Sequence, residues 1–140
     1  NLSFAAELLI KGLLLVTDKK TSKGHQLNQL FSELNESVRK QIKNRYEQFQ
    51  IIDKDDKSLS SFIMTVNKGQ EDKTISSLDK DLKTFLETHS KTFEAWRYVY
   101  EIGESGFRYE IDFKSMHCFI KALIETLNSI EWPGRFHRLE

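Results

Sequence analysis

The chain has 140 residues, of which 39% are hydrophobic and 30% are charged, proportions typical of a folded globular domain. One hydrophobic core is expected, because a second core would need about 100 further residues. The 21 basic and 21 acidic residues cancel. This balance excludes a broad positive field for non-specific binding of nucleic acid, so any contact with nucleic acid must be local.

Residues that interrupt helices are scarce. The sequence holds one proline, Pro133, and six glycines, so nothing before Pro133 forbids long helices. The single cysteine, Cys118, cannot form an internal disulfide, and no apolar run is long enough to span a membrane. We therefore expect a cytoplasmic protein without membrane contact. Asn1 in place of an initiator Met indicates a cut-out boundary, and Leu139 and Glu140 resemble a cloning remnant.

The N-terminal part of the chain predicts three helices. The first runs from Ser3, a suitable N-cap, to about residue 18, and its apolar circumference is typical of a central helix packed on several sides. We interpret Glu7 and Lys11 as an ion pair on the wet side of this helix, and a polar contact that faces a partner is the alternative. After a polar loop over residues 18–24, a second helix begins near His25 and a third covers about residues 36–50.

The next part of the chain is less regular. Residues 51–76 are expected to form a long variable loop that holds one short helix. From Leu78 to Tyr100 a stripe of apolar residues that also includes His89 advances by three or four positions at each step, which predicts a helix of about 24 residues that ends at Gly103. Apolar and polar residues alternate over residues 107–111, but this stretch is too short to build a sheet, so an extended connector is expected there.

A last helix is predicted between Asp112, which can cap it, and Pro133, before which it stops. Its apolar residues define a broad buried face. The predicted fold is therefore all-α, an antiparallel bundle of four to five helices that forms a single domain over residues 1–140. The antiparallel arrangement follows because short connections force neighbouring helices to reverse direction.

Histidines beside the apolar faces are the most informative polar residues. His25 opens the second helix, and His89 and His117 lie within the apolar stripes of the two long helices. Each one is interpreted either as a core histidine bonded to a backbone carbonyl or as part of a shared site. No two histidines lie at the spacing of metal ligands, so neither a metal site nor a cofactor is expected.

The sequence does not support two further kinds of site, a calcium-binding loop and a cysteine nucleophile. The acidic residues Asp53, Asp55 and Asp56 lack the glycine and the closing glutamate of a calcium-binding loop. Cys118 adjoins His117, but neighbouring positions on a helix point about 100° apart, so we interpret the thiol as a core residue and not as a nucleophile. The sequence also lacks a glycine-rich phosphate loop.

The densest aromatic stretch runs from Phe93 to Glu101, and its apolar stripe, which includes Trp96 and Tyr100, is expected to be core. Arg97 lies beside that stripe, where its guanidinium could hold a phosphate or contact a partner. The candidate ligand or polar-cleft residues of the whole chain are His25, Arg97, Tyr98, Glu101 and His117.

Basic residues gather in one part of the chain although the total charge cancels. Between residues 19 and 45 there are seven basic residues and only two acidic ones. Most such runs are solvated faces, and a phosphate-binding role or the orientation of a partner are the alternatives. This candidate basic patch consists of Lys19, Lys20, Lys23, Arg39, Lys40, Lys43 and Arg45.

Three segments together resemble the HEPN superfamily of prokaryotic helical domains. They are residues 5–14 with their Glu-x-x-x-Lys pattern, residues 24–31 with their Gly-His-x-Leu opening, and the aromatic stretch before the last long helix. The resemblance covers about residues 3–130 and implies a bundle of four or five helices, often a homodimer. It also implies a role in toxin-antitoxin or phage-defence systems, as a metal-independent ribonuclease or as the nucleotide-binding companion of a nucleotidyltransferase.

The ribonuclease motif of that superfamily is absent. Its members carry Arg, four to six residues and then His, whereas eight residues separate Arg108 from His117 and one separates Arg135 from His137. No catalytic residue is assigned. We therefore expect a non-catalytic, homodimeric module that binds nucleotide, RNA or a protein partner such as a nucleotidyltransferase. The alternatives are a metal-independent ribonuclease with a non-standard Arg/His site and a ligand-free structural or dimerisation scaffold.

Overall fold

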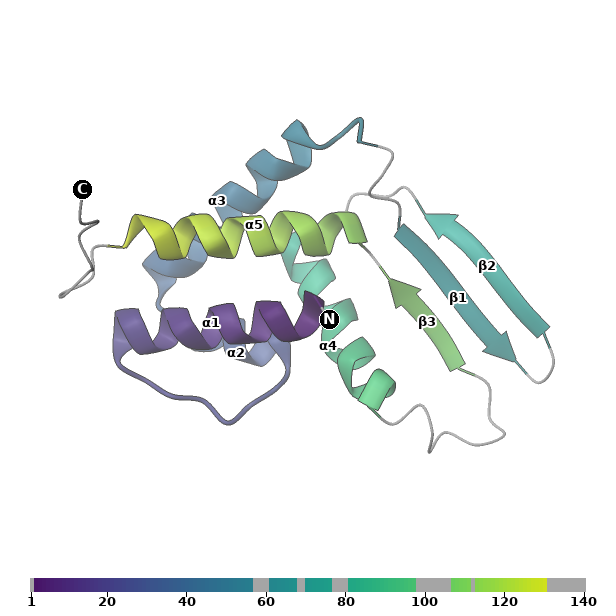
Figure 1. Ribbon diagram of the computed structural model, residues 1–140, viewed down its shortest axis with the longest axis horizontal. Helices are drawn as coiled ribbons and strands as arrows, with labels where there is room; N and C mark the ends of the chain where they lie inside the picture. The colour runs from purple at the N-terminus through teal and green to yellow at the C-terminus, as the bar shows by residue number, and fades with distance from the viewer. Residues whose placement is uncertain are drawn as a thin grey trace, which may run out of the picture.

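The computed structural model describes residues 2–56, 61–67, 70–76, 81–97, 107–111 and 113–130, with side chains described for 2–56, 81–90 and 113–130. Within these residues, five helices form a bundle, and a three-stranded sheet lies at one end of it (Figure 1). The helices are α1 (Leu2–Asp18), α2 (Leu27–Glu33), α3 (Glu36–Ile52), α4 (Leu82–Arg97) and α5 (Phe113–Ser129). The strands are β1 (Ser61–Asn67), β2 (Gln70–Ser76) and β3 (Phe107–Ile111).

The predicted helical bundle is confirmed. α5 packs against both α1 and α3, and α2 joins α1 to α4. α3 runs opposite to α5, whereas α1 and α5 run in the same direction (Figure 1). The antiparallel prediction thus holds for the pair α3 and α5 and is wrong for α1 and α5. Those two helices are separated by most of the chain, so no short connection forces them to reverse direction.

The expectation that the chain contains no sheet is wrong. Residues 51–76, predicted as a loop with one short helix, contain β1 and β2, and residues 107–111, predicted as a connector, form β3. β1 pairs antiparallel with both neighbours in the order β2-β1-β3, so that Phe62 lies opposite Ile75 on one side and Ile111 on the other. A strand as short as β3 persists because β1 supplies partners for its backbone.

Two helices begin at side-chain caps. Asn35 Oδ1 accepts a hydrogen bond from the N–H of Val38 at 2.9 Å, just before α3. Asp81 Oδ1 accepts one from the N–H of Thr84 at 2.7 Å, just before α4. Each cap satisfies a first-turn donor that the helix itself cannot pair. α4 therefore begins directly after Asp81 and not at the predicted Leu78, which lies outside the described residues.

An aromatic cluster forms the centre of the core. The ring of Phe85 on α4 lies 5.6 Å from that of Phe119 on α5 and 6.2 Å from that of Tyr46 on α3. All three side chains are fully buried. Burying one such ring contributes about 2–3 kcal/mol, so the contacts of Phe85 fix α4 against α3 and α5.

The Asn35 cap gives the first prediction. Asn35→Ala should lower the free energy of unfolding by about 1 kcal/mol, because the N–H of Val38 loses its acceptor. Urea denaturation followed by circular dichroism measures this change. The control is Gln41→Ala on the exposed side of α3, which should change stability by less than about 0.5 kcal/mol. Equal losses in the two variants would contradict the role of the cap.

Candidate functional site

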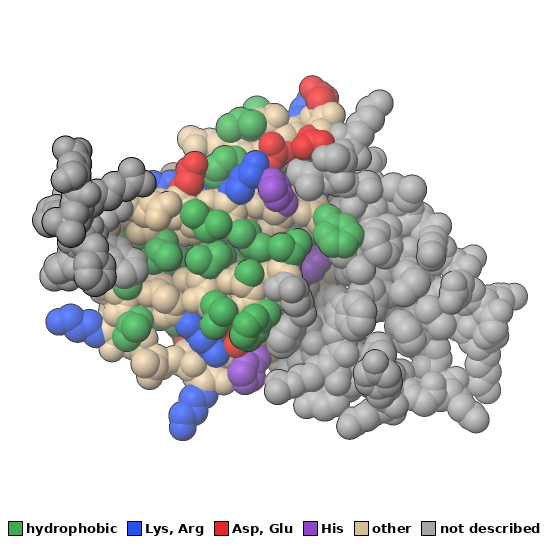
Figure 2. All heavy atoms as spheres, in the orientation of Figure 1, with side chains coloured by type: hydrophobic (Ala, Val, Ile, Leu, Met, Phe, Trp, Pro, Cys, Tyr) green, Lys and Arg blue, Asp and Glu red, His purple; other side chains and the backbone are tan. Residues whose placement is uncertain are grey.

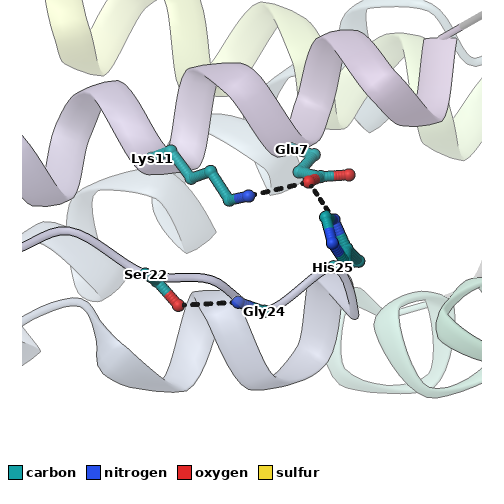
Figure 3. A network of polar contacts seen from close by, with 5 residues as sticks. All are labelled: Glu7, Lys11, Ser22, Gly24 and His25. Carbon is teal, nitrogen blue, oxygen red and sulfur yellow. Dashed lines mark hydrogen bonds and ion pairs between the residues drawn. The ribbon is translucent and has the colours of Figure 1, made fainter.

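A buried carboxylate on α1 is the centre of a polar cluster (Figure 3). One oxygen of Glu7, Oε1, lies 2.9 Å from Nζ of Lys11 and 2.7 Å from Nδ1 of His25. Lys11 comes from the next turn of α1, and His25 from the loop that joins α1 to α2 (Figure 3). The side chain of Glu7 is 5% exposed, whereas that of His25 is 53% exposed. We call these three residues the Glu7 cluster.

The predicted ion pair between Glu7 and Lys11 is confirmed, but its placement on the wet side of the helix is wrong for Glu7. The residue is buried, and its second partner, His25, is 18 positions away in the sequence. The core interpretation of His25 is wrong as well, because its ring is half-exposed and bonded to a carboxylate. Sequence spacing reveals a contact one helical turn away, but it cannot show that a loop folds back over the helix.

The protonation state of Glu7 determines which nitrogen of His25 carries a proton. Burial alone would raise the pKa of Glu7, but the hydrogen bonds and positive charges of Lys11 and His25 outweigh it, so this pKa lies below its ordinary value of 4.5. Glu7 is therefore ionised at neutral pH. Because an ionised carboxylate only accepts hydrogen bonds, Nδ1 of His25 must donate one. The neutral ring consequently has its free lone pair on Nε2.

The loop after α1 brings His25 back to Glu7. Lys19 adopts a left-handed conformation with φ of 51°, and the N–H of Lys20 donates to the carbonyl of Leu14 at 3.2 Å. This arrangement caps the last turn of α1 and reverses the chain. Further along, Ser22 Oγ accepts a hydrogen bond from the N–H of Gly24 at 3.2 Å (Figure 3). The loop is thus held at both ends before it reaches His25.

A serine on α4 fixes the beginning of α2. Ser90 is buried, and its Oγ accepts a hydrogen bond from the N–H of Asn28 at 2.9 Å while it donates to the carbonyl of Leu86 at 2.6 Å. The first turn of α2 therefore receives an acceptor from another helix. Sequence reasoning missed Ser90, because its partner lies 62 positions away.

The other candidate ligand residues do not join the Glu7 cluster within the described part of the chain. His117 lies on α5, and none of the described contacts joins it to His25. Arg97 is the last residue of α4, and its side chain is not described. Tyr98 and Glu101 lie outside the described residues. The predicted shared cleft of these residues therefore stays a prediction.

The burial expected of His89 and Cys118 is confirmed, whereas His117 is only partly buried. His89 is buried, and its ring lies 4.5 Å from that of Phe85. Cys118 is also buried, as expected for a core thiol. The predicted core residues Phe93 and Trp96 have no described side chains, and Tyr100 lies outside the described residues.

The candidate basic patch is divided between two places. Lys19, Lys20 and Lys23 are exposed on the loop after α1. Arg45 on α3 instead turns toward α5, where its Nη1 donates to Oγ1 of Thr126 at 2.8 Å. The other three residues of the patch, Arg39, Lys40 and Lys43, also lie on α3. The basic residues thus form one short exposed loop and a second group on α3, in which Arg45 is already hydrogen-bonded to α5.

Large apolar side chains remain exposed on two neighbouring helices. Phe4, Leu8 and Leu15 on α1 are 51–55% exposed, and Phe113 and Ile124 on α5 are also exposed. Figure 2 shows hydrophobic side chains gathered over α1 and α5 on one side of the molecule. We call these five residues the apolar face. The sequence predicts that neighbours pack α1 on several sides, and in the single chain this side stays open.

Comparison with known proteins gives no match to a family model, to a curated protein or to a solved structure. Among the described residues, no group of three His, Cys, Asp or Glu side chains could hold a metal ion. None of the described helices combines the length and apolar character that a membrane span requires. The Glu7 cluster and the apolar face are the two features of the described residues that bear on function.

The Glu7 cluster gives the second prediction. Glu7→Gln should lower the free energy of unfolding at pH 7 by about 1–3 kcal/mol, because the buried hydrogen-bond network loses the negative charge that Lys11 and His25 face. Since the pKa of Glu7 is lowered by folding, the ionised group stabilises the fold above pH 4.5, and this contribution disappears as pH falls through the lowered pKa. Urea denaturation at a series of pH values measures both effects.

The matched control for this prediction is Glu33→Gln on the exposed surface of α2. This variant should match the wild type within about 0.5 kcal/mol. The difference between Glu7→Gln and the wild type should shrink in acid. A loss of stability that stays constant from pH 7 to pH 3 would contradict the stabilising role of the ionised carboxylate.

Proposed function

We propose that this chain is a non-catalytic, HEPN-like helical module that binds a protein partner through the apolar face, in a toxin-antitoxin or phage-defence setting. The supporting observation is the exposure of the large side chains that form the apolar face on α1 and α5. A large side chain has roughly 200 Å² of surface, so the side chains of the apolar face, which are 38–55% exposed, leave about 500 Å² in water. Contiguous apolar patches of that size mark interaction sites.

The energetics favour a partner that is itself apolar. Covering about 500 Å² at about 25 cal/mol per Å² contributes about 12 kcal/mol. Association costs about 4–15 kcal/mol in lost freedom of motion. The apolar face of one chain therefore only balances that cost, and a partner that buries an equal apolar area supplies the surplus. The simplest such partner is a second copy of the chain.

Charge gives less support to a nucleic-acid ligand. The basic residues of the candidate patch are divided between a loop and α3, and Arg45 is engaged with α5. Lys11 is paired with the ionised Glu7. The formal charge of the chain is zero, so a broad attraction for phosphate is missing. The apolar face is therefore the favoured binding surface, and the basic loop is the less favoured one.

A charge placed within the apolar face tests this function. Leu8→Glu should abolish self-association, because a carboxylate would be buried without a partner in the interface. Sedimentation equilibrium should show a mass that rises with concentration from one chain toward two for the wild type, and the mass of one chain for the variant. The control, Gln48→Glu on the exposed side of α3, adds the same charge elsewhere and should behave like the wild type.

Two results would overturn this proposal. One is a wild-type mass of a single chain at every concentration, and the other is unchanged association in Leu8→Glu. Circular dichroism should show that both variants keep the helical content of the wild type. This comparison separates a loss of association from a loss of folding.

The ribonuclease alternative is favoured by one observation, the pairing of Glu7 with Nδ1 of His25. A carboxylate in this position orients a histidine that acts as a general base. No described arginine completes the Glu7 cluster, so we expect the purified protein not to cleave single-stranded RNA. Cleavage that persists in chelator and is lost in His25→Ala would favour the ribonuclease over the binding module.

A further inference from the structure

Gly12 is a residue that the single chain does not explain. It lies within α1, where glycine is among the least favourable residues for a helix. Apart from its two chain neighbours and the nearby backbone of α1, a Cβ atom built on Gly12 would meet no atom within 4 Å. Neither a tight contact inside the chain nor a special backbone conformation therefore requires glycine at this position. A close contact with another molecule would be a physical reason for a glycine here.

The position of Gly12 links it to the apolar face. Residues three and four apart lie on the same side of a helix, so Gly12 follows Leu8 by one turn and precedes Leu15 by nearly one turn. Leu8 and Leu15 are both about half-exposed. On the open side of α1, Gly12 therefore lies between the large side chains of Leu8 and Leu15, and no side chain covers the backbone at Gly12 itself.

We propose that two copies of the chain pack α1 against α1 on a two-fold axis and cross at Gly12. This inference rests on the proposed function, because it assigns the partner of the apolar face. At the crossing, the missing side chain lets the two backbones approach closely. Leu8 and Leu15 of each copy then pack beside the crossing point. In a two-fold interface both copies use the same surface. Here that surface contains both Gly12, where a side chain is missing, and the leucines that border it.

Area and charge agree with a second copy as the partner. Two apolar faces together bury about 1,000 Å², which is the lower limit for a specific protein interface. The charge of Lys11, at the margin of the open side of α1, is balanced by Glu7 at 2.9 Å. Two copies can therefore approach without repulsion between unpaired charges on α1.

Substitution of Gly12 by a larger residue tests the crossing. In sedimentation equilibrium, Gly12→Ala should raise the dissociation constant of self-association at least tenfold, and Gly12→Leu should raise it more. The melting temperature of Gly12→Ala, measured at a concentration where the chain is a monomer, should equal or exceed that of the wild type, because alanine favours the helix. The control Asn44→Ala, on the exposed side of α3, should leave the dissociation constant unchanged.

A cross-link gives a second, independent readout. Under mild oxidation, Gly12→Cys should form a disulfide-linked dimer, because the two positions meet at the crossing within the short Cα distance that a disulfide needs. Gln48→Cys should not form one. Cys118 is fully buried and stays in place.

The outcomes distinguish this inference from the function on which it rests. If Gly12→Ala associates like the wild type, or if Gly12→Cys gives no cross-linked dimer, the crossing at Gly12 is wrong. If Leu8→Glu is nevertheless a monomer, the apolar face still binds a second copy in another geometry. A wild type that stays monomeric overturns both proposals.

Discussion

The buried charge of Glu7 constrains the N-terminal half of this fold. An ionised carboxylate removed from water is costly unless donors replace its hydration. α1 supplies one donor, Lys11, from its own next turn, and the second must come from elsewhere in the chain. The loop after α1 therefore returns to place His25 at 2.7 Å from Glu7. α2 starts directly after this contact, so the position of α2 depends on the same interaction.

α1 separates two kinds of surface. One side carries the Glu7 cluster, in which every charge has a partner. Another side carries Leu8, Gly12 and Leu15, which are left open by α2 and α5. A helix that is apolar around most of its circumference needs cover on all sides, and this chain supplies only part of that cover. We propose that a second copy of the chain covers the open side of α1. The Glu7 cluster has a different role, because it holds the loop that carries His25 against α1.

Periodicity in the sequence predicts most of the helical part and little of the rest. α1, α3 and α5 follow from apolar residues at spacings of three and four, and the Asn35 cap fixes where α3 begins. The sheet was missed, although Asn67 pairs with Gln70 and Gly69 between them is a hairpin signal. The contact of His25 with Glu7 and that of Ser90 with Asn28 could not be predicted, because both depend on the tertiary fold. The apolar circumference of α1 predicts a central helix packed on several sides, whereas Leu8 and Leu15 are about half-exposed in the single chain.

The position of the proton on the His25 ring shows whether the Glu7 carboxylate accepts a hydrogen bond from it. For the neutral ring, nitrogen NMR of histidine-labelled protein distinguishes a proton on Nδ1 from one on Nε2, and the His25→Ala spectrum assigns the signals. The ionised Glu7 predicts that His25 carries its proton on Nδ1, and that this preference weakens in Glu7→Gln. A proton on Nε2 in the wild type would show that Glu7 does not accept from His25, and would contradict the account of the loop and of α2.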